Sequence, residues 1–191
     1  MDERPDLEVT PETFFRERLL EAMERLRMDL SAWTEFYLVN LLARRALTGL
    51  ALSEPLVLKL KQAVEAERSD TRFYMYRDVG DNALMLSGFF PDYIARKGVA
   101  ASYVVSMGTG AYRVTASLSA RYDGLGEAYE ALSEDFAEFA RLIDEVRSLT
   151  TLRVAEDTVS LFEHWKKTKS PSTAERLWSK GLVPDRGDYT D

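Results

Sequence analysis

The sequence predicts an all-α fold, an irregular bundle of about seven to nine helices. Three observations favour this class: apolar residues recur at steps of three and four, capping residues and glycines bound these stretches, and only residues 103–122 also suit a strand. The 191 residues are 46% hydrophobic and 30% charged, which is ordinary globular composition, and no Pro-, Gly- or Ser-rich linker divides them. We therefore expect a single helical domain over 1–191, with a polar tail at 183–191.

The first helical pattern begins at Thr10, whose side chain can cap the helix that Pro11 opens. Apolar residues then keep one face continuous as far as Gly49, a plausible end. This pattern predicts one long helix or two helices in line, with a possible break at residues 29–31.

Three shorter helical segments follow. Ser53 is expected to cap a helix that continues to Val64. A longer helix is expected over 70–87, because the residue before Pro91 is pushed out of the helical region of backbone space. Residues 92–96 are then expected to form one short turn.

Residues 103–122 are ambiguous, since a strand-like start at Tyr103 is followed by Gly108 and Gly110. We favour a helix, because no other segment offers a strand with which it could pair. The two glycines also resemble the start of a dinucleotide-binding fingerprint, but Arg113 occupies the third-glycine position. Their simpler interpretation is close packing of two helices.

The clearest helical signal lies between Leu125 and Val146. Apolar residues alternate there at steps of four and three, which predicts one helix with a single buried seam. The seam consists of Leu125, Tyr129, Leu132, Phe136, Phe139, Ile143 and Val146. Two further helices are expected near 154–165 and 172–181.

The formal net charge is -7, from 25 Lys and Arg against 32 Asp and Glu. A chain of this sign is repelled by phosphate backbones and anionic headgroups, so we expect neither a nucleic-acid nor a membrane partner. Residues 1–6 lack the features of a secretory signal, and no apolar run approaches the roughly 18–20 residues of a membrane span. The sequence therefore predicts a cytoplasmic protein.

The residue inventory also limits the chemistry. There is no cysteine, which excludes disulfides, thiolate nucleophiles and Cys-based metal sites. The single histidine, His164, excludes a carboxylate-bridged di-iron bundle, which needs two Glu-x-x-His pairs. We expect no metal and no cofactor.

The most unusual local feature is the pair Gly80 and Asp81 inside an otherwise apolar helix. A buried Asp81 must be hydrogen-bonded, and Tyr103, Ser106 or Tyr112 on the following long helix are the available donors. Two interpretations stay open: the cluster orients two helices, or it anchors a small aromatic-lined pocket. The candidate ligand-binding residues are Asp81, Phe89, Phe90, Tyr93, Tyr103, Ser106 and Tyr112.

The middle third of the chain resembles an uncharacterised family of bacterial cytoplasmic helical proteins that has no assigned activity. The resemblance implies a bacterial origin and a helical fold, and it supplies no catalytic residue. It is carried by residues 76–81, 88–91 and 36–42, together with Tyr103, Met107, Gly108, Ala111 and Tyr112.

Two functional hypotheses follow. The preferred one is a non-enzymatic protein-interaction module that forms a homodimer or binds another protein, because the sequence offers amphipathic seams without a convergent catalytic set. The alternative is a small-molecule-binding protein or an enzyme built on Asp81 and its neighbouring aromatics.

Overall fold

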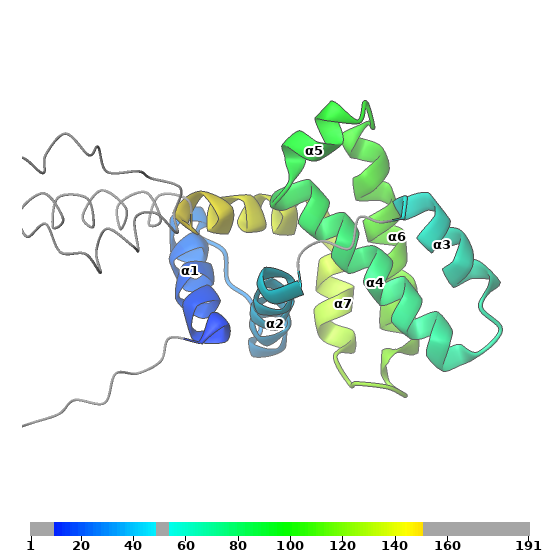
Figure 1. Cartoon of the computed structure of the whole chain (residues 1–191). Coiled ribbons are helices and arrows are strands. Elements are labelled where there is room, and N and C mark those ends of the chain that lie inside the picture. The colour runs from blue at the N-terminus through cyan, green and yellow to red at the C-terminus, as the bar shows by residue number, and fades with distance from the viewer. Residues whose placement is uncertain (1–9, 49–53, 151–191) are drawn as a thin grey trace, which may run out of the picture. The chain divides into compact units, whose positions relative to one another are not determined.

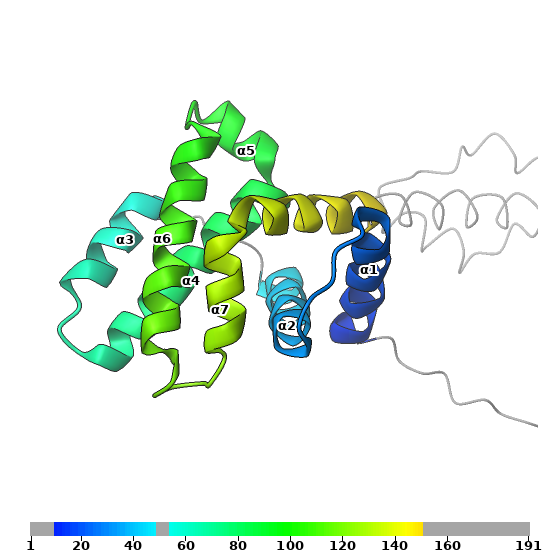
Figure 2. The same ribbon diagram turned by 180° about the vertical axis from the view of Figure 1, so that it is seen from behind.

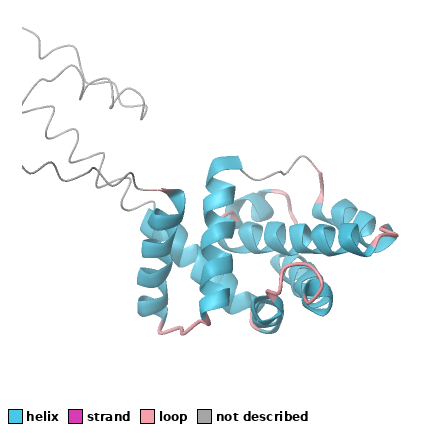
Figure 3. Ribbon diagram, turned by 90° about the horizontal axis from the view of Figure 1, so that it is seen from below, coloured by secondary structure: helices cyan, strands magenta, loops and turns pink. Residues whose placement is uncertain are grey.

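The computed structural model describes residues 10–48 and 54–150, and within these ranges it is helical without a strand (Figure 3). The all-α prediction is therefore confirmed for the described residues. Seven helices have defined bounds: α1 (Pro11–Leu26), α2 (Ala32–Thr48), α3 (Leu56–Glu65), α4 (Ser69–Gly88), α5 (Pro91–Arg96), α6 (Ala101–Ser119) and α7 (Gly126–Glu134). Residues 136–150 form a further helical stretch.

The long helices α4 and α6 pack against each other at the centre of the described helices. Helix α3 lies on α4, and α7 lies beside α6 (Figures 1 and 2). Helices α1 and α2 pair with each other, and α2 contacts α7. None of the described helices combines the length and apolar composition needed to cross a bilayer.

The chain divides into two compact units, Met1–Arg147 and Ser148–Asp191. The seven helices with defined bounds belong to the first unit. The helices expected near 154–165 and 172–181, His164 and the polar tail at 183–191 lie outside the described residues.

The N-terminal pattern forms a helical hairpin, so the expectation of helices in line is wrong. The backbone of Arg27 is left-handed, with a φ of 54°, and its N–H donates to the Glu24 carbonyl at the end of α1. Ser31 then caps α2, because its Oγ accepts from the Thr34 N–H at 3.2 Å. The reversal brings α1 against α2, where the Arg16 guanidinium reaches the Glu35 carboxylate at 2.9 Å.

The predicted helices over 70–87 and 103–122 are confirmed as α4 and α6, and the short turn at 92–96 is confirmed as α5. Helix α3 begins at Leu56. Its N-cap residue is Pro55, which has no side-chain acceptor, so no side-chain capping hydrogen bond forms there. The predicted capping residue Ser53 lies outside the described residues.

The seam of residues 125–146 is not one helix, which corrects the prediction. It breaks at Asp135, whose φ of -116° and ψ of 35° end α7, and whose carbonyl accepts the Phe139 N–H that starts the next stretch. The two halves have different neighbours: Tyr129 of α7 packs on Tyr37 of α2, whereas Glu145 reaches Arg25 of α1. The seam residues of both halves are buried except Leu125, which is half-buried just before α7, so the periodicity located the core but not the break.

Candidate functional site

Asp81 lies at the centre of a buried polar cluster that joins three helices. Its side chain projects from α4 and is 2% exposed. Oδ1 accepts hydrogen bonds from the Tyr37 hydroxyl of α2 and, at 3.0 Å, from the Tyr112 hydroxyl of α6. Oδ2 accepts from the Arg44 guanidinium of α2 at 2.7 Å. Both carboxylate oxygens are therefore occupied by donors of the chain itself.

Aromatic packing fixes the two tyrosines that hold Asp81. The Tyr112 ring stacks on Tyr129 of α7 with centroids 6.1 Å apart, and Tyr37 meets Tyr129 edge to face at 5.0 Å. Gly80 allows this arrangement, because a Cβ there would lie 2.8 Å from the Tyr112 ring. Gly80 is thus a point of close approach between α4 and α6.

A second polar group lies at the other end of Tyr129. Its hydroxyl donates to the Asp123 carboxylate at 2.6 Å, and the Arg77 guanidinium lies 3.7 Å from the same oxygen. Arg77 also covers the Tyr74 ring, 5.1 Å from its centroid. These contacts tie the loop that precedes α7 to the outer side of α4.

The electrostatics of the cluster favour hydrogen bonding over proton transfer. Burial raises the pKa of Asp81, and the Tyr37 hydroxyl and the Arg44 guanidinium oppose this rise. Burial and the neighbouring Asp81 raise the pKa values of Tyr37 and Tyr112 well above their ordinary range. The phenols therefore keep their protons and act as donors, which suits a cluster that orients helices.

The structure divides the candidate ligand-binding residues into separate groups. Asp81 and Tyr112 lie together in the core, whereas Tyr93 and Tyr103 line a groove on the surface. Ser106 is exposed on α6 and does not contact Asp81 within the described residues. Of the three predicted donors to Asp81, Tyr112 is confirmed, and Tyr103 and Ser106 are wrong.

The phenylalanines Phe89 and Phe90 form a third group at the end of α4. Their rings lie 5.2 Å apart in a tilted arrangement, with Phe89 partly buried and Phe90 exposed. Asp81 is not among the residues that line four of the best-formed hollows in the described part of the chain, and Phe89 and Phe90 line none of the four either. A pocket that joins these aromatics to Asp81 stays a prediction.

Sequence reasoning missed two of the three donors to Asp81, Tyr37 and Arg44. The apolar periodicity places Tyr37 on the buried face of α2 and says nothing of Arg44. A usable signal existed: the two residues are seven positions apart, which places them two turns apart on the same side of α2. A tyrosine inside an apolar stripe needs a partner for its hydroxyl when it is buried.

The groove that Tyr93 and Tyr103 line lies between α3, α5 and α6 and has a volume of about 470 Å³. Four buried apolar side chains form its floor: Leu86, Ile94, Val104 and Met107. Its walls include exposed apolar side chains, among them Val57 and Val99. We call it the α3–α5–α6 groove.

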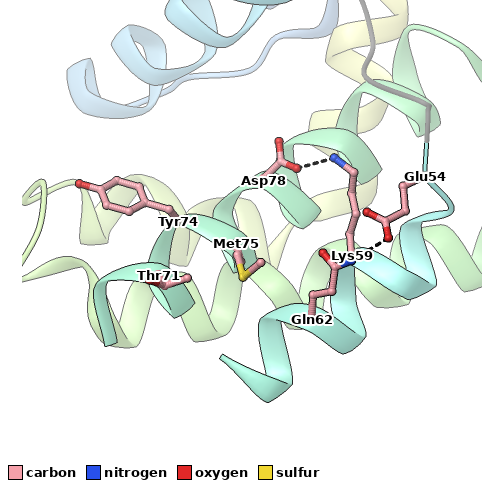
Figure 4. Close-up of a pocket in the computed structure, with 7 residues that line it drawn as sticks. All are labelled: Glu54, Lys59, Gln62, Thr71, Tyr74, Met75 and Asp78. Carbon is pink, nitrogen blue, oxygen red and sulfur yellow. Dashed lines mark hydrogen bonds and ion pairs between the residues drawn. The ribbon is translucent and has the colours of Figure 1, made fainter. Parts of the chain in front are cut away.

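A smaller, polar hollow lies between α3 and α4 (Figure 4). The Lys59 ammonium donates to the Asp78 carboxylate at 2.7 Å, and the Gln62 amide donates to Glu54 at 2.7 Å. Arg45 of α2 reaches the other Asp78 oxygen at 3.1 Å. The charged side chains that line this hollow therefore already have hydrogen-bond partners within the chain.

Helix α2 carries an exposed aromatic pair on its outer side. Trp33 and Phe36 are each 55% exposed, and their rings meet edge to face with centroids 6.5 Å apart. We call these two residues the Trp33–Phe36 patch. Exposed large aromatics that contact each other are typical of protein-interaction surfaces.

The described residues contain no cluster of three or more His, Cys, Asp or Glu side chains that could hold a metal ion. The resemblance to a bacterial family stays a prediction. Comparison of the chain with protein-family models, with curated proteins and with solved structures finds no match.

Proposed function

We propose that this chain is a non-enzymatic helical interaction module that self-associates through the Trp33–Phe36 patch. The observation that carries the proposal is the simultaneous exposure of a tryptophan and a phenylalanine on one helix. Fully burying one side chain the size of Phe is favourable by about 1.5–3 kcal/mol, and neither exposed ring gains this free energy in the monomer. A partner surface would recover it.

The partner that suits this patch is a second copy of the chain. In a two-fold dimer the same patch lies on both subunits, so apolar rings meet apolar rings and no charge is buried without a counterion. The Glu35 carboxylate, two residues after Trp33, is already paired with Arg16 at 2.9 Å, so it would not enter the contact as an unpaired charge.

The interior of the molecule supports a binding role over a catalytic one. Asp81, the one buried carboxylate among the described residues, is fully engaged by Tyr37, Tyr112 and Arg44. Catalysis by this group would require a reacting atom within hydrogen-bond reach, and its oxygens are covered by the protein.

The test is sedimentation equilibrium or light scattering of the full chain over low to high micromolar concentrations. The native chain is expected to shift from monomer to dimer, and the double variant Trp33→Ala/Phe36→Ala should weaken dimerisation by at least about 30-fold. Added salt should strengthen the native dimer, because it screens the repulsion between two copies of charge -7.

The matched control is Leu58→Ala/Val64→Ala, which removes two comparably exposed side chains from α3. It should leave the association constant unchanged, and far-ultraviolet circular dichroism should report the same helix content for all three proteins. A native chain that stays monomeric at high micromolar concentration, or equal effects of the two double variants, would contradict the proposal.

A further inference from the structure

The α3–α5–α6 groove has the dimensions and lining of a small-molecule site, and it is separate from the Trp33–Phe36 patch. Its volume of about 470 Å³ lies within the ~300–1,000 Å³ range of ligand pockets. Its floor is wholly apolar, and Leu86, Ile94 and Val104 there are each less than a tenth exposed. Such a floor favours a ligand with a hydrocarbon body.

The charged groups at the groove are distributed unequally. Lys97 is the one cationic side chain in its lining, and it forms no ion pair within the described residues; its ammonium lies 5.8 Å from the centroid of the Tyr93 ring. The one carboxylate, Glu54, accepts a hydrogen bond from Gln62 at 2.7 Å. Glu54 thus has a hydrogen-bond donor within the chain, whereas no described side chain forms a hydrogen bond or an ion pair with the Lys97 ammonium. Lys97 is therefore the charged group that a ligand anion can meet.

The backbone around the groove has the same preference. Helices α3 and α6 begin beside it and have no acidic residue in the first turn, whereas α1, α2, α4 and α7 each have one. A helix N-terminus carries a partial positive charge that such acids would offset. The N-termini of α3 and α6 therefore add a partial positive charge at the groove, whereas Glu54 before α3 and Asp92 in the first turn of α5 are acidic residues.

From this combination we propose that the α3–α5–α6 groove binds a long-chain carboxylate, with the hydrocarbon chain on the floor and the carboxylate at Lys97. Tyr93 and Tyr103 line the same groove, and a tyrosine hydroxyl can donate to a carboxylate headgroup. An apolar floor with one cation at its edge matches the two ends of such a molecule.

Isothermal titration of the full chain with decanoate and dodecanoate, below their micelle concentrations, tests the hydrocarbon part. Binding of one molecule per chain is expected, and each added methylene that enters the groove should lower Kd by about fourfold. Val57→Asp, which places a charge in the apolar wall, should weaken dodecanoate at least about tenfold. Leu58→Asp is the control, because it alters a similarly exposed neighbour outside the groove.

The charge of the headgroup is tested on α5. Lys97→Glu should weaken dodecanoate at least about tenfold and leave dodecanol unchanged, whereas Arg96→Glu makes the same charge change one residue away, outside the lining, and should have little effect. Equal losses in the two variants would indicate a general field effect and would overturn the proposal.

Three further results would also overturn it. The first is an absence of heat and of chemical-shift change with dodecanoate. The second is a Kd that does not vary with chain length. The third is a loss of self-association in Val57→Asp without any dodecanoate binding to the native chain, which would assign the groove to a second copy of the protein.

Discussion

The inward and outward sides of α4 and α6 differ in how their side chains are satisfied. On the inward side, Asp81 and Tyr112 are buried and hydrogen-bonded to each other at 3.0 Å. On the outward side, Asp78 is 43% exposed although it pairs with Lys59, and Tyr103 of α6 is 49% exposed. The polar groups on the inward side are already hydrogen-bonded to other residues of the chain. We therefore expect a ligand to bind to the exposed side chains on the outward side.

The largest expected loss of stability comes from removing the buried Asp81 carboxylate on the inward side of α4. Asp81→Ala leaves Tyr37, Tyr112 and Arg44 without their acceptor, and breaking such a buried set should lower the free energy of unfolding by about 3–5 kcal/mol. Asp81→Asn keeps one acceptor oxygen and should cost about 1–3 kcal/mol. Urea unfolding followed by circular dichroism measures both.

The outward control is Asp78→Ala, one turn earlier on the same helix. Because the Asp78 carboxylate is 43% exposed, its loss should cost less than that of Asp81, about 1–2 kcal/mol, although its partners Arg45 and Lys59 are only 9% and 17% exposed. A loss as large as that of Asp81→Ala would remove the distinction between the two sides of α4.

A smaller effect is expected from two glycines of α6 that face opposite environments. A Cβ at Gly108 would collide with the Phe136 ring and lie 2.8 Å from the Ala83 Cβ, so Gly108→Ala should cost about 1–3 kcal/mol. A Cβ at Gly110 would meet nothing within 4 Å, so Gly110→Ala should stabilise the helix by about 0.5–1 kcal/mol. Opposite shifts of the melting temperature would confirm the contrast.

These two glycines also show which part of the helix packing could be predicted from the sequence. The Gly-x-Gly pattern was interpreted as close helix packing, which is confirmed at Gly108 and wrong at Gly110. Helical periodicity supports the difference, since residues two apart project about 200° from each other around a helix. At most one of the two could face the neighbouring helix.

The same periodicity explains why the predicted ligand-binding residues Tyr103 and Tyr112 do not lie together beside Asp81. Tyr103 and Tyr112 are nine residues apart, which places them about 180° apart around α6. Only Tyr112 can therefore reach Asp81, and Tyr103 must face the groove, as the structure has it. This separation was available from the sequence once residues 103–122 were taken as helical.

Other features depend on tertiary contacts that no local pattern encodes. The left-handed backbone at Arg27 turns α1 and α2 into a hairpin, although a non-glycine residue rarely adopts this conformation. The break at Asp135 lies within an uninterrupted apolar repeat, with no glycine or proline to mark it. The turn at Arg27 and the break at Asp135 each depend on which helices the flanking buried faces pack against. That packing is a property of the whole bundle and not of the local sequence.

The finest distinction between the two sides of α4 is the pH dependence of its two carboxylates. Partial burial favours a higher pKa for Asp78, but Lys59 and Arg45 outweigh it and hold the pKa below its usual value. Its stabilising contribution is therefore present above the unfolded pKa of about 4 and is lost as the pH falls through the lower folded pKa. The deficit of Asp78→Asn should shrink in acid.

Asp81 should show the opposite trend, because burial raises its pKa in the folded state. The folded protein then holds this proton more tightly than the unfolded chain, so the contribution of Asp81 is full below about pH 4 and decreases as the pH rises through the folded pKa. The deficit of Asp81→Asn should grow in acid while that of Asp78→Asn shrinks. Urea titrations of both variants and the native chain across the acid range measure the two slopes. Slopes of the same sign would mean that the Tyr37, Tyr112 and Arg44 donors outweigh burial and lower the pKa of Asp81 in the folded state.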